Sequence, residues 1–114
     1  WPLRRRGPAR CRDVIAAHRG RALELVAWSI SRKDVSATYD HAADGSPLAQ
    51  PRFESMAFVT LEDETALVET TWFPDTYRRY AVLLERREPL TIAGVVEVAF
   101  GFATLRVDRA WVVR

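Results

Sequence analysis

Residues 56–74 constrain the fold of this chain most, because they hold two strand-like segments in close succession and a proline that ends the second. Phe58–Leu61 and Leu67–Phe73 are rich in Val, Thr, Phe and Trp, which suit a pleated, half-buried surface. Between them, Glu62–Thr65 offers side chains that hydrogen-bond their own backbone in tight reversals. Pro74 cannot continue a central strand. The pattern predicts a β-hairpin followed by a helix.

Composition indicates one domain. The chain has 114 residues, of which 48% are hydrophobic and 28% charged, as in an ordinary globular protein that buries a single core. No apolar run approaches the roughly 20 residues needed to span a bilayer, so no membrane partner is expected. Cys11 is the only cysteine, which excludes an internal disulfide and favours a cytoplasmic location. Because the chain begins at Trp1 and its only methionine is Met56, we expect a piece of a longer protein.

Charge is distributed unevenly along the chain. Residues 1–21 hold seven arginines and one acid, a balance of +6, whereas residues 22–114 hold ten basic and fourteen acidic residues, a balance of −4. The leader has the sign that attracts phosphates. The remainder has no such surplus, which counts against strong charge-driven binding by the body of the domain.

The other elements are predicted from the spacing of apolar residues and from the positions of glycine and proline. We expect a basic leader and a short helix within residues 1–21, with the helix over Ala9–Arg19, and a barrel domain over 22–114. A strand is expected from Leu23 towards Val35. Residues 36–55 contain Asp-Gly and two prolines, and two alternatives stay open: a protruding ribbon or a mobile loop.

The second half completes a recognisable order of elements. An amphipathic stripe predicts a helix over Asp75–Arg87, and strands are expected at Leu90–Val98 and Ala103–Val113. Gly94 indicates a bulge or bend. Five strands with a helix between the third and the fourth is the order of the OB-fold. The predicted class is therefore all-β, a five-stranded Greek-key barrel with one or two short helices.

The same residues resemble a known family. The block from Met56 to Thr65, Met-Ala-Phe-Val-Thr-Leu-Glu-Asp-Glu-Thr, and the exit Phe73-Pro-Asp75 resemble the C-terminal OB domain of the bacterial DNA polymerase III alpha subunit, replicative or error-prone. The similarity covers roughly residues 22–113. It implies a non-catalytic module that holds single-stranded DNA in replication or error-prone repair. It also implies a parent DNA-directed DNA polymerase, a nucleotidyltransferase whose catalytic carboxylates lie in another domain.

The resemblance further implies partners: single-stranded DNA, the remaining domains of the polymerase subunit and other replisome proteins. Two departures stand against it. Ala66 replaces the family's usual glycine, and residues 34–55 carry four acids against Arg52 alone, where the family has a short basic loop. The rival interpretation is a protein-interaction module with a degenerate OB face. A third, an RNA-binding anticodon-type domain, is disfavoured by Glu62, where a basic residue is expected.

Candidate binding residues follow from the way OB-folds place ligands, across strands 2 and 3 between the first and last loops. Because side chains alternate, Phe58 and Thr60 share one face, and the uniformly apolar Ala57, Val59 and Leu61 share the other. Phe58 is then either a base-stacking platform, as in the similar block of aspartyl- and lysyl-tRNA synthetases, or a core residue. Glu69 is expected on the Phe58 face, where its carboxylate accepts hydrogen bonds from base amines.

Further candidates lie at the rim. Arg32 and Lys33 are expected to contact phosphates, with ordinary surface charge as the alternative. Phe100 and Phe102 flank Gly101 in the last turn, and either grip a base or fold back onto the barrel. No catalytic residue, cofactor or metal is expected, since Glu62–Glu64 and the two histidines lack further ligands at suitable spacing.

Overall fold

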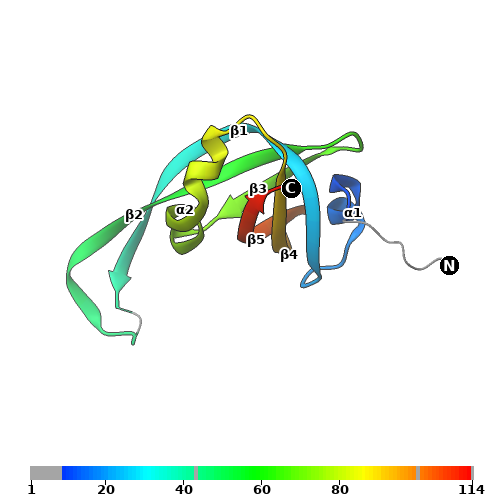
Figure 1. Cartoon of the computed structure of the whole chain (residues 1–114). Coiled ribbons are helices and arrows are strands. Elements are labelled where there is room, and N and C mark those ends of the chain that lie inside the picture. The colour runs from blue at the N-terminus through cyan, green and yellow to red at the C-terminus, as the bar shows by residue number, and fades with distance from the viewer. Residues whose placement is uncertain (1–8, 43, 100, 114) are drawn as a thin grey trace.

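Five strands close into a barrel in the computed structural model, which describes residues 9–42, 44–99 and 101–113. They are β1 (Ala22–His41), β2 (Pro47–Glu62), β3 (Leu67–Trp72), β4 (Leu90–Ala99) and β5 (Phe102–Val112). The order around the barrel is β1-β2-β3-β5-β4, and β4 pairs back onto β1. Only the β3–β5 pair is parallel among the named pairs. The predicted five-stranded all-β barrel is confirmed, and it is consistent with an OB-type barrel (Figure 1).

Short helices accompany the barrel. α1 (Cys11–Ala16) lies on the side away from the long hairpin, and α2 (Pro74–Tyr80) lies between β3 and β4, as predicted (Figure 1). The single helix expected over Asp75–Arg87 is instead α2 followed by the 3-10 helix η1 (Ala81–Glu85). Leu83 and Leu84 of η1 both pack against the core. Within the described ranges, no helix is long and apolar enough to cross a membrane.

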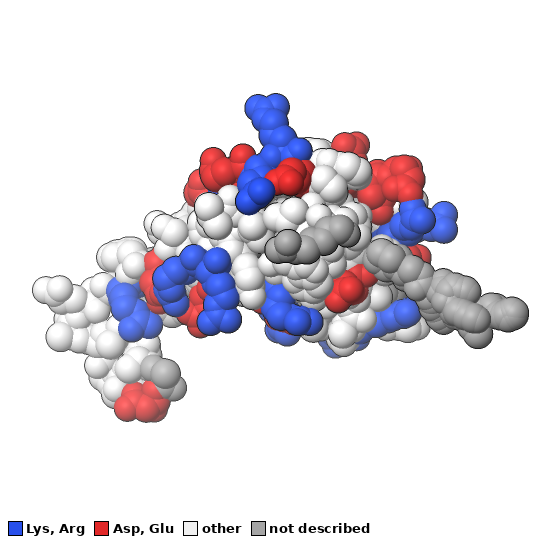
Figure 2. Space-filling model, viewed as in Figure 1, with Lys and Arg blue, Asp and Glu red and all other residues white. Residues whose placement is uncertain are grey.

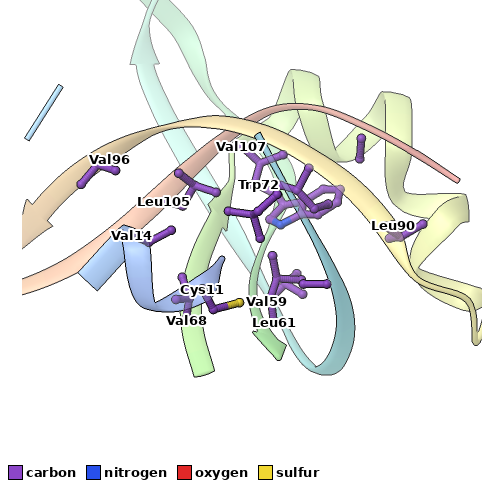
Figure 3. Close-up of a cluster of buried hydrophobic side chains, with 14 of the residues drawn as sticks. Cys11, Val14, Val59, Leu61, Val68, Trp72, Leu90, Val96, Leu105 and Val107 are labelled. Atoms are coloured by element: carbon purple, nitrogen blue, oxygen red, sulfur yellow. The ribbon is translucent and has the colours of Figure 1, made fainter. Parts of the chain in front are cut away.

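The core fills the barrel with side chains from every strand and from α1 (Figure 3). Trp72 is the largest fully buried side chain. Its indole N–H donates to Thr70 Oγ1 at 2.9 Å, and that hydroxyl donates to the Val59 carbonyl at 2.7 Å. These two bonds satisfy the polar atoms that β3 buries, which otherwise carry a desolvation cost. Figure 3 shows Cys11 and Val14 of α1 beside Val68 and Leu105.

One carboxylate joins α1 to the β2–β3 turn. Asp63 Oδ2 accepts the Cys11 backbone N–H at 2.7 Å, and Oδ1 accepts the backbone N–H and the hydroxyl of Thr65 at 2.7 and 2.6 Å. The Ala66 N–H also donates to Oδ1, at 3.2 Å. These bonds hold the turn that contains Ala66. The acidic block therefore contains a structural carboxylate at its centre.

Residues 36–55 form a protruding ribbon, the first of the two alternatives. Beyond Ala27, β1 has no described partner except β2, and the two strands continue as a hairpin to His41 and Pro47. The hairpin extends away from the barrel, and the molecule measures 57 × 30 × 22 Å (Figure 1). At its tip, Asp44 Oδ1 accepts hydrogen bonds from the Ser46 N–H and hydroxyl at 2.9 and 2.7 Å.

Gly94 lies at an irregularity in the pairing of β4 with β5. The register between these strands shifts between Ala93 and Gly94, so the predicted irregularity is confirmed. A Cβ at position 94 would lie 2.3 Å from the Arg106 carbonyl oxygen and 3.0 Å from Leu105 Cγ. Glycine is required here by the approach of the neighbouring backbone.

Candidate nucleic-acid interface

The outward face of β1, β2 and β3 presents an aromatic ring beside a cation. Lys33 lies opposite Phe58 in the β1–β2 ladder, and Phe58 lies opposite Thr71 in the β2–β3 ladder. Phe58 is 42% exposed, whereas its chain neighbours Ala57 and Val59 are fully buried. Alternation along β2 therefore directs Phe58 outward, and the alternative that Phe58 is a core residue is excluded.

The next row of the same face is polar. Thr60 lies opposite Glu69, and its hydroxyl donates to Glu69 Oε1 at 2.8 Å. Ser31 lies opposite Thr60 on the other side. Phe58, Thr60 and Glu69 thus share one face, as alternation predicts, with Lys33 at the edge of that face. Cross-strand neighbours of this kind have Cβ atoms about 5 Å apart, so one base can contact several of them.

Arg32 lies on the opposite face of the sheet from Phe58. It is opposite the buried Val59, and its guanidinium pairs with Glu85 of η1 at 2.9 Å and with Asp34 at 3.8 Å. Adjacent residues of a strand point to opposite sides, so Arg32 and Lys33 cannot both serve one face. The structure brings Lys33 to Phe58 and leaves Arg32 beside the helical segment.

Of the two aromatic residues predicted at the turn between β4 and β5, the structure describes Phe102. Phe102 begins β5 and is 73% exposed, so its ring does not fold back into the core. By alternation it shares a face of β5 with Arg106, about 13 Å further along the strand. The prediction for Phe100 falls outside the described residues.

Sequence reasoning missed Arg106. This residue lies beside Thr71 in the parallel β3–β5 ladder, so it extends the row that contains Lys33 and Phe58. Its guanidinium pairs with Glu97 of β4 at 3.2 Å. Alternation in β5 predicts that Arg106 points outward, but only closure of the barrel sets β5 beside β3.

A pocket under the ribbon was also missed. Tyr39 lies opposite Arg52, on the ribbon face that continues from Lys33 and Phe58, and the Arg52 guanidinium lies 5.6 Å from the centre of the Tyr39 ring. Together with Phe73 and Asp75 these residues line a pocket of about 420 Å³. Phe73 is 44% exposed. The signal in the sequence is weak, since the pocket exists only because residues 36–55 form a ribbon.

Positive and negative charges are interspersed over the surface. Figure 2 shows Lys and Arg interspersed with Asp and Glu, and acidic atoms at the free end of the hairpin. Glu54 pairs with Arg52 at 3.4 Å and with Arg78 at 3.2 Å. By contrast, no ion pair to Lys33 or Glu69 occurs among the described residues. Lys33 is therefore a cation of this face without an ion-pair partner among the described residues.

Cys11 and Asp63, outside this face, have the largest pKa shifts among the described residues. Burial raises the pKa of the Cys11 thiol to about 12, with a further contribution from the Asp63 carboxylate. Burial also tends to raise the pKa of Asp63, but the hydrogen bonds from Thr65, Cys11 and Ala66 outweigh it and lower the value to about 2. Cys11 is thus a protonated core residue. Over the described part of the chain, no three His, Cys, Asp or Glu side chains are grouped to hold a metal ion.

Comparison with known proteins gives one partial similarity. Over 56 residues, 47% of this chain, the sequence is 39% identical to the error-prone DNA polymerase of Symbiobacterium thermophilum. The matched region spans 5% of that polymerase. No protein-family model and no solved structure matches the chain. About half of this chain is therefore similar to a small segment of a DNA polymerase.

Proposed function

We propose that this domain binds single-stranded DNA as a non-catalytic OB module of a DNA polymerase III alpha-like subunit, in cytoplasmic replication or error-prone repair synthesis. The observation that carries the proposal is the row Lys33–Phe58–Thr71 on the outward face of the barrel. An exposed ring flanked by a cation and small polar side chains is the arrangement that stacks a base and holds its phosphate. The partial similarity to a DNA polymerase supports the same context.

The energetics favour weak binding. Stacking of one base on an aromatic side chain contributes about 1–3 kcal/mol. Phosphate contacts add affinity that falls with salt, but most arginines near this face are already paired with acids. We therefore expect micromolar rather than nanomolar dissociation constants. Phe102 and the Tyr39–Arg52–Phe73 pocket lie beyond the two ends of the central row, and they provide further contacts for a longer strand.

The direct test is a titration of this chain with a fluorescently labelled, mixed-sequence oligonucleotide at low and at physiological salt. A strand of about eight nucleotides is within the range that one OB-fold binds. We expect saturable binding that weakens with salt. A strand of about four nucleotides should bind less tightly, because it offers fewer bases and phosphates to these contacts. Absence of binding at high micromolar protein concentration at low salt would reject the proposal.

The second candidate function is a protein-interaction module that has kept the barrel without its nucleic-acid activity. The observation that favours it is a cleft of about 800 Å³ on the barrel, lined by Trp28, Ile30 and Leu84 together with charged residues. Trp28 and Ile30 are 47% and 48% exposed. Under this alternative the oligonucleotide titration gives no binding at either salt concentration, so the same experiment separates the two functions.

A further inference from the structure

Four side chains form a compact square on the outward face of β2 and β3. Phe58 lies opposite Thr71, and Thr60 lies opposite Glu69. Residues two apart along a strand share a face, so Glu69 is the diagonal neighbour of Phe58. Diagonal neighbours on a sheet are about 7 Å apart, which is within reach of the edge of a base that stacks on the ring.

The Glu69 carboxylate is held in place and keeps acceptor capacity. The Thr60 hydroxyl donates to Oε1 at 2.8 Å, and no other bond to Glu69 occurs among the side-chain contacts of the described residues. An ionised carboxylate accepts hydrogen bonds and donates none. Any base edge that meets Glu69 must therefore offer an N–H group.

Nucleobases differ in what they offer. Adenine, cytosine and guanine carry exocyclic amino groups, whereas thymine presents a carbonyl oxygen at the equivalent position of cytosine. The N3–H of thymine lies between two carbonyl oxygens, so a carboxylate that approaches it also meets oxygen lone pairs. An exocyclic amino group therefore donates a hydrogen bond to the carboxylate, whereas the carbonyl oxygens of thymine repel it.

We propose that Glu69 makes the Phe58 position select a base with an exocyclic amino group over thymine. This inference rests on the proposed binding of single-stranded DNA by the same face. It names a specificity-determining residue and explains why a face that must attract phosphates carries an exposed carboxylate without an ion-pair partner among the described residues. Thr60 has a positioning role, because its hydroxyl orients the carboxylate.

The experiment compares oligomers of 5-methyl-deoxycytidine and of thymidine, which share the methyl group and differ in the amine that Glu69 would accept. We expect this chain to bind the methylcytosine oligomer about three- to tenfold more tightly, as one hydrogen bond at a partly exposed site provides. Glu69→Gln should raise the affinity for both oligomers by removing a negative charge. It should raise the affinity for thymidine more, because the amide can also donate, and so remove the preference.

Glu62→Gln is the matched control, since it removes the same charge from an exposed position on the same face of β2. It should raise both affinities equally and leave the preference intact. Thr60→Val should reduce the preference without changing the net charge. Equal binding of the two oligomers by the unmodified chain, or an unchanged preference in Glu69→Gln, would overturn this inference alone. Failure to bind either oligomer would overturn the proposed function and this inference with it.

Discussion

Lys33 lies directly opposite Phe58 in the β1–β2 ladder, so an ammonium group and an exposed aromatic ring share one face of the barrel. The next residue back along the chain, Arg32, points to the other face and pairs with Glu85. One step along a strand therefore separates a residue suited to bind a ligand from one that ties β1 to η1.

Phe58→Ala should weaken oligonucleotide binding about five- to thirtyfold, since it removes the stacking surface for one base. The change should lower the free energy of unfolding by only about 1 kcal/mol, because Phe58 is 42% exposed. Fluorescence anisotropy and urea unfolding measure the two effects. Phe53→Ala is the control: Phe53 is 67% exposed, lies on the opposite face of the ribbon, and should leave binding unchanged. Loss of folding in Phe58→Ala would contradict its outward placement.

Lys33→Gln should weaken binding of all sequences alike and reduce the slope of log K against log salt by about 0.7, as the loss of one phosphate contact on a single strand predicts. Arg32→Gln should leave that slope unchanged, because its guanidinium lies on the far face in an ion pair. Binding isotherms at several salt concentrations provide the measurement. Equal slope changes in the two variants would show that the strand follows the rim rather than the face.

Gly94→Ala should destabilise the fold by about 2–3 kcal/mol, the cost of inserting a methyl group against the backbone of the neighbouring strand. The new Cβ would lie 2.3 Å from the Arg106 carbonyl oxygen, which is backbone. Gly101→Ala is the comparison, because its added Cβ meets nothing within 4 Å and only the positive φ of +81° is unfavourable. That variant should lose about 1 kcal/mol. Urea unfolding measures the stability of both variants. If Gly101→Ala lost more stability than Gly94→Ala, the β4–β5 register would be wrong.

The stability of the domain should fall as pH decreases from about 4 to about 2. Asp63 has a folded-state pKa of about 2 against an ordinary value of 3.8, because four hydrogen bonds favour its charged form. A lowered folded pKa contributes stability above the unfolded pKa, and that stability is lost as pH falls through the folded pKa. The contribution is about 2 kcal/mol at neutral pH.

Asp63→Asn should lower the free energy of unfolding at neutral pH by about 2 kcal/mol. It should also reduce the acid limb, which is the fall in stability between pH 4 and 2. Glu62→Gln, at the exposed last residue of β2 next to Asp63, should leave the pH dependence of stability between pH 4 and 2 as it is. Thermal unfolding followed by circular dichroism across this pH range measures both variants. An acid limb that is equally steep in Asp63→Asn would locate the responsible carboxylates elsewhere.

Local patterns in the sequence were sufficient for the order of elements. Alternating apolar residues, the acidic turn and Pro74 predict β2, β3 and the helix that follows, and each depends on contacts between residues close in the chain. Alternation also separates the Phe58–Thr60 face from the buried set of Ala57 and Val59. The position of Gly94 in a strand predicted an irregularity there, which the register shift confirms.

The tertiary structure decided what depends on residues far apart in sequence. Barrel closure places Arg106 of β5 beside Thr71 of β3, and no local periodicity specifies which strands become neighbours. Asp63 meets Cys11 across 52 positions, so its role as a joint between turn and helix is invisible in the acidic run itself. The ribbon and its pocket likewise follow from the long pairing of β1 with β2, since the local sequence of residues 36–55 was compatible with either a ribbon or a mobile loop. The strands, the turns and the faces of each strand follow from local patterns, because side-chain alternation depends on neighbouring residues. Which faces combine into a site depends on closure of the barrel.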